Sequence, residues 1–136
     1  MDKSGGPADL PGRTYAEMVS PAGLKAVRAY ADGIGPNQAM VLDLAAAPRP
    51  VATGLVADAH GQGLKVHCWT ARKENAFLPR SLQIGDPSAA DFPGRSGRID
   101  VLLQALYGAG VDGVFSDFTT LNHDARARFL ATRTGA

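Results

Sequence analysis

The chain has 136 residues, of which 45% are apolar and 20% charged, proportions typical of one folded globular domain rather than a disordered segment. Its 14 Lys and Arg nearly balance its 13 Asp and Glu, so the charge gives no support for nucleic acid or an anionic membrane surface as a partner. A single cysteine, Cys68, excludes an internal disulfide, and no apolar run approaches the ~20 residues of a membrane span.

The first predicted helix follows a stretch, residues 1–14, that is rich in Gly and Pro and predicts a loop. Ser20 and Pro21 are typical of a helix start, Ser as the N-cap and Pro at the first helical position. The helix presents one apolar face, formed by Leu24, Val27 and Ala31. Residues 31–36 then predict a short strand that turns sharply at its Gly-Pro end.

The next segment, residues 40–44, is compatible with either a short helix or an extended piece. Thr53 is the predicted N-cap of a further helix, which Gly61 or Gly63 closes. The apolar side chains expected to face inward from this helix are Leu55, Val56 and Ala59.

An apolar-rich run at residues 64–69 predicts a buried strand, and it ends abruptly in the polar segment 70–75. His67 lies within this run, and we interpret it as a packed or partly buried side chain rather than a catalyst. His60, His67 and His123 have no metal-ligand spacing, so the sequence gives no support for a zinc site.

A long loop, residues 76–97, contains three prolines, and a loop of this length in a domain is either functional or mobile. The clearest helical pattern follows, with apolar residues at Ile99, Leu102, Leu103 and Leu106. Residues 111–118 predict a strand that ends at Asp117, after which Asn122 is the predicted cap of a last helix. Its inward-facing residues are expected to be Ala125, Phe129 and Leu130.

This order of elements predicts an α/β fold with about three parallel strands joined by right-handed crossovers. Ligands of such sheets bind at the C-terminal ends of the strands. Asp32, Glu74 and Asp117 are expected near strand ends, although the residues alone favour a turn or capping carboxylate over a site role for Asp32. Arg72 and Lys73 would supply cationic donors there, so the residues alone predict an anion- or phosphate-binding end of the sheet.

Four blocks of the sequence, taken in order, resemble the bacterial glycerophosphodiester phosphodiesterases, in particular their longer, periplasmic-type branch. They are Tyr-Ala-Asp-Gly-Ile-Gly-Pro at 30–36, Ala-His-Gly-Gln-Gly-Leu-Lys-Val-His at 59–67, Trp-Thr-Ala-Arg-Lys-Glu-Asn at 69–75 and Gly-Val-Asp-Gly-Val-Phe-Ser-Asp at 110–117. The resemblance covers nearly the whole chain, and its specificity comes from the order and spacing of the blocks.

The resemblance implies a (β/α)8 TIM barrel, of which the predicted strands would be the sixth to eighth, so that residues 1–136 form the C-terminal portion. It implies metal-dependent hydrolysis of glycerophosphodiesters to glycerol 3-phosphate and an alcohol, with a divalent cation, calcium or magnesium, as cofactor. The substrate-binding residues it implies in this chain are Asp32, Trp69, Arg72 and Asp117.

The family's catalytic block, a His-Arg pair followed by a Pro-Glu-Asn-Thr-like run, has no counterpart among the 136 residues, and neither do its metal-binding carboxylates. We therefore assign no catalytic residue or metal ligand to this chain and expect it to be inactive alone, as the product of a truncated or divided reading frame. The glycerophosphodiester would bind once an N-terminal half completes the site.

A second hypothesis is a non-enzymatic α/β module that binds phosphate or self-associates through its open sheet edges. The first residues lack the apolar core of a signal peptide, whereas the family branch is often exported, so the sequence leaves the compartment open.

Overall fold

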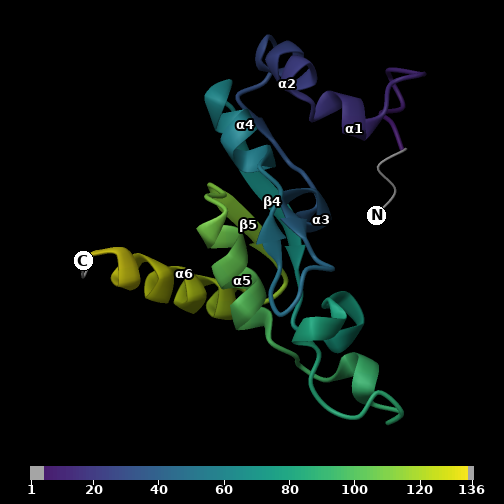
Figure 1. Cartoon of the computed structure of the whole chain (residues 1–136), viewed down its shortest axis with the longest axis vertical. Helices are drawn as coiled ribbons and strands as arrows, with labels where there is room; N and C mark the ends of the chain where they lie inside the picture. Colours follow the sequence, from purple (N-terminus) through teal and green to yellow (C-terminus); the bar gives the residue numbers. More distant parts are fainter. Residues whose placement is uncertain (1–4, 135–136) are drawn as a thin grey trace.

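A three-stranded parallel sheet runs through the centre of the molecule, in a computed structural model that describes residues 5–134 (Figure 1). The strands are β1 (Gly33–Ile34), β4 (Lys65–Ala71) and β5 (Gly113–Ser116), and β4 lies between the other two. Both pairings are parallel. The predicted α/β class with parallel strands is thereby confirmed.

The central strand alternates between a covered and an uncovered face. Val66 and Cys68 are fully buried under the helices α4 (Leu55–Gly61) and α5 (Ile99–Gly108), whereas Lys65, His67 and Trp69 are exposed. The prediction that His67 is packed or partly buried is therefore wrong, because the period of two places it on the face that no helix of the described chain covers.

The first helices are short and begin as their polar caps dictate. In α1 (Tyr15–Met18), Thr14 and Glu17 form a capping box, so the chain leaves its opening loop just before this turn. In α2 (Pro21–Arg28), the Ser20 hydroxyl accepts a hydrogen bond from the Gly23 N–H, as predicted.

The segment between β1 and α4 contains α3 (Gln38–Val41) and an antiparallel pair, β2 (Leu42–Asp43) with β3 (Val51–Ala52). Residues 40–44 thus contain both of the predicted alternatives, first the end of the short helix α3 and then the extended strand β2. Thr53 is not the N-cap of α4: that position belongs to Gly54, whose φ of +91° only glycine adopts readily. The Thr53 hydroxyl instead donates to the carbonyl of Met40 at 2.6 Å.

The last two helices differ in how much they bury. In α5 the four apolar residues predicted from the sequence, Ile99, Leu102, Leu103 and Leu106, are all in the core. α6 (Thr119–Thr134) buries Ala125 fully, but Leu130 is 43% exposed, so the prediction that Leu130 faces inward is wrong.

Asn122 lies inside α6 rather than at its start, which corrects the predicted cap. Its side-chain N–H donates to the carbonyl of Val114 at 3.0 Å, and its side-chain oxygen accepts from the Tyr107 hydroxyl. The residue therefore joins α6 to β5 and α5 instead of starting the helix.

The long loop projects beyond the C-terminal end of β4 (Figure 1). It contains three short 3₁₀ turns, η1 (Asn75–Phe77), η2 (Arg80–Leu82) and η3 (Phe92–Gly94). Its centre is Asn75, which is fully buried and whose Nδ2 donates to the carbonyls of Ile84 and Phe92 at 2.9 and 3.0 Å. The Ile84 N–H returns a hydrogen bond to the Asn75 Oδ1 at 3.1 Å. The loop thus closes around one polar side chain.

Among residues 5–134, no helix is both long enough and apolar enough to cross a lipid bilayer.

Candidate functional site

The C-terminal ends of β4 and β5 meet at one edge of the sheet. Ala71 pairs with Ser116, and the Ser116 hydroxyl donates to the Ala71 carbonyl at 2.9 Å. The same hydroxyl oxygen accepts the N–H of Phe118 at 3.1 Å. β4 is irregular just before this point, where the register shifts between Cys68 and Ala71 and the Trp69–Thr70 peptide is cis. Residues that follow both strands are therefore brought side by side.

Arg72 and Asp117 form an ion pair across this edge, with Arg72 Nε 2.9 Å from Asp117 Oδ2. Their side chains are 41% and 47% exposed, so both stay accessible to a ligand. The guanidinium carbon of Arg72 also lies 4.6 Å from the centre of the Phe77 ring. A carboxylate and an aromatic face thus orient the guanidinium from two elements.

Lys73 brings a second cation to the same edge. Its Nζ lies 4.5 Å from the centre of the Phe118 ring, a cation–π geometry. Glu74 follows, with one carboxylate oxygen, Oε2, that is buried and without a hydrogen-bond partner among the described residues. We name the group Trp69, Arg72, Lys73 and Asp117 the rim.

Trp69 stands at the uncovered face of β4, and its indole N–H donates to the carbonyl of Gly35 at 2.7 Å. It is 46% exposed. Together with Thr70, Phe115, Ser116 and Asp117 it lines an open depression of about 430 Å³. Trp69 therefore extends the rim onto the open face of the sheet.

Asp32 is not part of the rim. It precedes β1, and its carbonyl accepts the N–H of Lys65 at the beginning of β4, so it lies at the N-terminal edge of the parallel sheet. Its side chain is 95% exposed and pairs with Arg28 at 2.8 Å in an i,i+4 arrangement. The expectation that Asp32 approaches a ligand from the same side as Trp69, Arg72 and Asp117 is therefore wrong. Asp32 precedes its strand, whereas Trp69 lies near the C-terminal end of β4 and Arg72 and Asp117 directly follow β4 and β5.

A second polar cluster, also at the N-terminal edge, is centred on Asp112. Its carboxylate accepts hydrogen bonds from the Val66 N–H at 2.9 Å, His60 Nε2 at 2.8 Å and Lys65 Nζ at 3.2 Å. Burial alone would raise the pKa of Asp112, but these three donors outweigh it and lower the pKa to about 2. His60, at the end of α4, thus hydrogen-bonds the carboxylate of Asp112, which lies just before β5.

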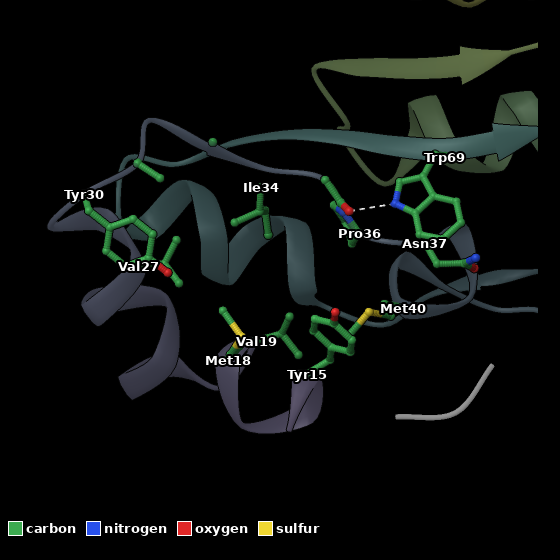
Figure 2. A pocket seen from close by; sticks show the side chains of 13 residues that line it. Tyr15, Met18, Val19, Val27, Tyr30, Ile34, Pro36, Asn37, Met40 and Trp69 are labelled. Atoms are coloured by element: carbon green, nitrogen blue, oxygen red, sulfur yellow. Dashed lines mark hydrogen bonds between the residues drawn. The ribbon is translucent and has the colours of Figure 1, made fainter. Parts of the chain in front are cut away.

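A larger cavity of about 540 Å³ lies along the outer edge of β1 (Figure 2). Its walls are mostly apolar and come from α1, α2 and β1, with Trp69 at one end. Figure 2 shows Tyr15, Met18 and Val19 on one side and Ile34 and Pro36 on the other. Because it offers few polar groups, this cavity is unlike the rim.

Residues 5–134 contain no group of three or more His, Cys, Asp or Glu side chains close enough to hold a metal ion. The rim carboxylate nearest to the open depression, Asp117, is paired with Arg72. The residues described here therefore do not by themselves fit a divalent cation.

The structure brings four residues named from the sequence, Trp69, Arg72, Lys73 and Asp117, to one edge of the sheet, and their role as ligand-binding residues stays a prediction. The ring contacts of Phe77 and Phe118 with Arg72 and Lys73 were not predicted. Phe118 directly follows Asp117 in the sequence, and this adjacency could have indicated that its ring lies at the same edge of the sheet. Phe77 reaches Arg72 only through the turn η1, and no local pattern indicates that contact.

Comparison with known proteins confirms the resemblance to the family, whereas the periplasmic-type branch stays a prediction. A model of the glycerophosphoryl diester phosphodiesterase family matches residues 3–121. The Arabidopsis thaliana protein glycerophosphodiester phosphodiesterase GDPD6 is 35% identical over 112 residues, which are 82% of this chain and 27% of that relative. The chain thus spans about a quarter of the length of this relative. The family match over most of the chain and this identity together establish that the chain belongs to the glycerophosphoryl diester phosphodiesterase family.

Proposed function

We propose that this chain is part of an enzyme that hydrolyses glycerophosphodiesters to glycerol 3-phosphate and an alcohol, and that its rim binds the glycerophosphate group. Family membership supports the reaction class. The observation that carries the rim assignment is the Arg72–Asp117 ion pair, which fixes a guanidinium at the shared C-terminal end of two parallel strands.

Arg72 is the proposed phosphate ligand. Asp117 engages its Nε, and the guanidinium has further N–H groups in a planar fork whose geometry matches two oxygens of a phosphate. Lys73 adds a point charge beside it. Both cations rest against aromatic rings, which limits their freedom before a ligand arrives and so reduces the entropy lost on binding.

Trp69 and Asp117 are the proposed contacts for the glycerol moiety. The half-exposed indole offers an apolar surface to the carbon chain, and the carboxylate of Asp117 is an acceptor for hydroxyl groups. Both line the open depression of about 430 Å³ at the end of β4 and β5. Asp32 is left out of this proposal because it lies at the other edge of the sheet.

The divalent cation implied by the family would polarise the phosphoryl group when bound. Since the described residues include no group of three metal ligands, we propose that such an ion takes its ligands from residues outside 5–134. We further propose that the three parallel strands form the C-terminal portion of a (β/α)8 barrel. The alternating order of strands and helices and the uncovered face of β4 support this.

The affinity of the purified chain for glycerol 3-phosphate tests the rim. Arg72→Gln removes the guanidinium and keeps a polar side chain, and we expect it to weaken binding about tenfold or more, as for loss of a charge-assisted contact. Arg28→Gln is the matched control, because Arg28 is also a surface arginine in an ion pair with an aspartate but lies at the other edge of the sheet. Equal affinities of wild type and Arg72→Gln would contradict the assignment.

A turnover assay with sn-glycero-3-phosphocholine separates binding from catalysis. The sequence has no counterpart of the family's His-Arg and Pro-Glu-Asn-Thr-like block, so we expect binding without release of glycerol 3-phosphate. Metal-dependent turnover that Arg72→Ala abolishes would show that this chain has its own catalytic groups, and would overturn the expectation of inactivity.

A further inference from the structure

Phe77 connects the long loop to the rim. Its ring centre lies 4.6 Å from the guanidinium carbon of Arg72, and its side chain is half-exposed. The ion pair of Arg72 with Asp117 is made at Nε, and one such contact leaves other torsions of this long side chain free. The ring is therefore the second contact that sets the direction of the guanidinium.

The two ends of the loop pair with each other as a short antiparallel ladder. The Lys73 carbonyl accepts the N–H of Gly97 at 2.8 Å, and the Asn75 N–H donates to the Arg95 carbonyl at 2.8 Å. This ladder begins at the residue that directly follows Arg72. The loop is thus closed at its base and attached to the segment that carries the rim arginine.

Asn75 fixes the turn η1, which carries Phe77 two residues later. Its side chain bonds the backbone of Ile84 and Phe92 inside the loop. Its carbonyl accepts the side-chain N–H of Gln83 at 2.9 Å. Since the main chain and the side chain of one buried residue are both held, the turn that presents the ring depends on the interior of the loop.

Gly97 completes that interior from the other end of the loop. A Cβ atom at this position would lie 2.7 Å from Asn75 Oδ1 and 2.6 Å from the carbonyl oxygen of Leu82, too close for either to accommodate without moving. The third atom nearest to it belongs to Leu78. A methyl group at residue 97 therefore disturbs the packing around Asn75 from a position outside the rim.

We infer that Phe77 is a positioning residue for Arg72, and that the loop of residues 75–97, closed around Asn75, holds the ring in place. The order of the loop interior thereby sets how well the rim binds an anion. This inference rests on the function proposed for the rim in its choice of ligand, whereas the orientation of Arg72 in the free chain is tested without one.

The second cation of the rim is held differently. The ring beside Lys73 belongs to Phe118, which follows β5 and whose N–H donates to the Ser116 hydroxyl oxygen at 3.1 Å. The sheet rather than the loop therefore places this ring. Loosening the loop should separate Arg72 from its ring and leave the contact of Lys73 intact.

The affinity of the full chain for glycerol 3-phosphate tests the positioning role. Phe77→Leu keeps an apolar side chain but removes the ring, and we expect the Kd to rise about threefold, the size of one exposed cation–π contact. Phe77→Tyr keeps the ring and should keep the wild-type Kd. Tyr30→Leu is the matched control, because it removes an exposed ring that precedes β1 and should leave the Kd unchanged.

The Arg72 Nε–H signal of the free, isotope-labelled chain tests the same contact without a ligand. Because an aromatic ring shifts the signals of protons beside it, Phe77→Leu should move this signal, and Phe77→Tyr should not. Gly97→Ala should move it in the same direction as Phe77→Leu. Asn75→Ala, which loosens the loop from its centre, replaces Gly97→Ala in this comparison if the glycine variant fails to fold.

The two measurements separate this inference from the function proposed for the rim. No saturable binding by the wild-type chain would refute the rim as the glycerophosphate site, and the Arg72 signal would still decide whether the loop positions the guanidinium. Equal Kd values for a binding wild type and Phe77→Leu would overturn the inference. So would an Arg72 signal that stays in place in Gly97→Ala while the Ile84 amide, bonded to Asn75 in the wild type, loses its protection from hydrogen exchange.

Discussion

Arg72 Nε lies 2.9 Å from Asp117 Oδ2, and this single ion pair links the segments that follow β4 and β5. Both side chains are more than 40% exposed, and exposed ion pairs contribute about 0–1 kcal/mol to stability. The pair therefore orients the guanidinium rather than stabilising the fold.

The stability of Arg72→Gln checks this distinction. We expect its free energy of unfolding to fall by less than about 1 kcal/mol in urea titrations, with the difference shrinking at high salt. Arg28→Gln should behave alike, since Arg28 and Asp32 form a similarly exposed pair. A loss above about 2 kcal/mol for Arg72→Gln alone would make the pair structural, contrary to its exposure.

Asn75 holds the loop of residues 76–97 together, because its buried amide bonds the backbone of Ile84 and Phe92. Asn75→Ala would leave these backbone groups without their partner, at about 1–3 kcal/mol for each buried group. We expect a total loss of about 3 kcal/mol and faster protease cleavage within the loop. Ser81→Ala, at an exposed position of the same loop, should leave both unchanged. A loss below about 1 kcal/mol for Asn75→Ala would show that the loop does not depend on this side chain.

Asp112 makes stability depend on pH at the opposite edge of the sheet. Its folded-state pKa of about 2 lies below the ordinary 3.8, so its contribution is complete above pH 3.8 and is lost as the pH falls through about 2. Because His60 and Lys65 are partly exposed, we expect the charged Asp112 carboxylate to contribute only about 1 kcal/mol to the free energy of unfolding.

Urea unfolding of Asp112→Asn at several pH values measures this contribution. The variant should be less stable than wild type at pH 7, and the difference should narrow toward pH 2.5. Asp9→Asn, in an exposed turn, is the control. A difference that is constant with pH would exclude the carboxylate charge as the cause.

Cys68 should be chemically silent in the folded protein. It is fully buried in β4, and burial raises the pKa of its thiol to about 12, so thiolate is scarce at pH 8. We expect a thiol-specific disulfide reagent to modify it only at the rate of unfolding. Ser81→Cys would supply an exposed thiol that reacts quickly in the same molecule. Rapid modification of Cys68 under native conditions would contradict its burial.

The sequence predicted those parts of the structure in which a strong local pattern agrees with the packing. The apolar face of α5 and the central strand β4 are of this kind, and Arg72 and Asp117 met at the sheet edge because parallel strands end together. Where the signal was local, tertiary contacts overrode it: the side chain of Asn122, which would cap a helix in isolation, instead bonds Val114 and Tyr107.

The remaining errors have equally specific causes. Asp32 was expected on the same side as the rim, but β1 begins only at Gly33. Asp32 therefore precedes this strand and lies at the N-terminal edge of the sheet. His67 was expected to pack because its neighbours in β4 are apolar, yet the alternation of the strand turns it to the uncovered face. The ring contacts of Arg72 and Lys73 depend on how the chain turns after each strand, and residue type does not reveal that.

Amide chemical shifts of the isotope-labelled chain, titrated with glycerol 3-phosphate, map where this ligand binds and so test the rim directly. We expect saturable shifts concentrated at residues 69–73 and 116–118, with the Arg72 Nε–H signal among those that move. Shifts centred on Arg28, Lys65 and His60 at the opposite edge, or no saturable shift at millimolar ligand, would contradict the assignment of the rim as the glycerophosphate site.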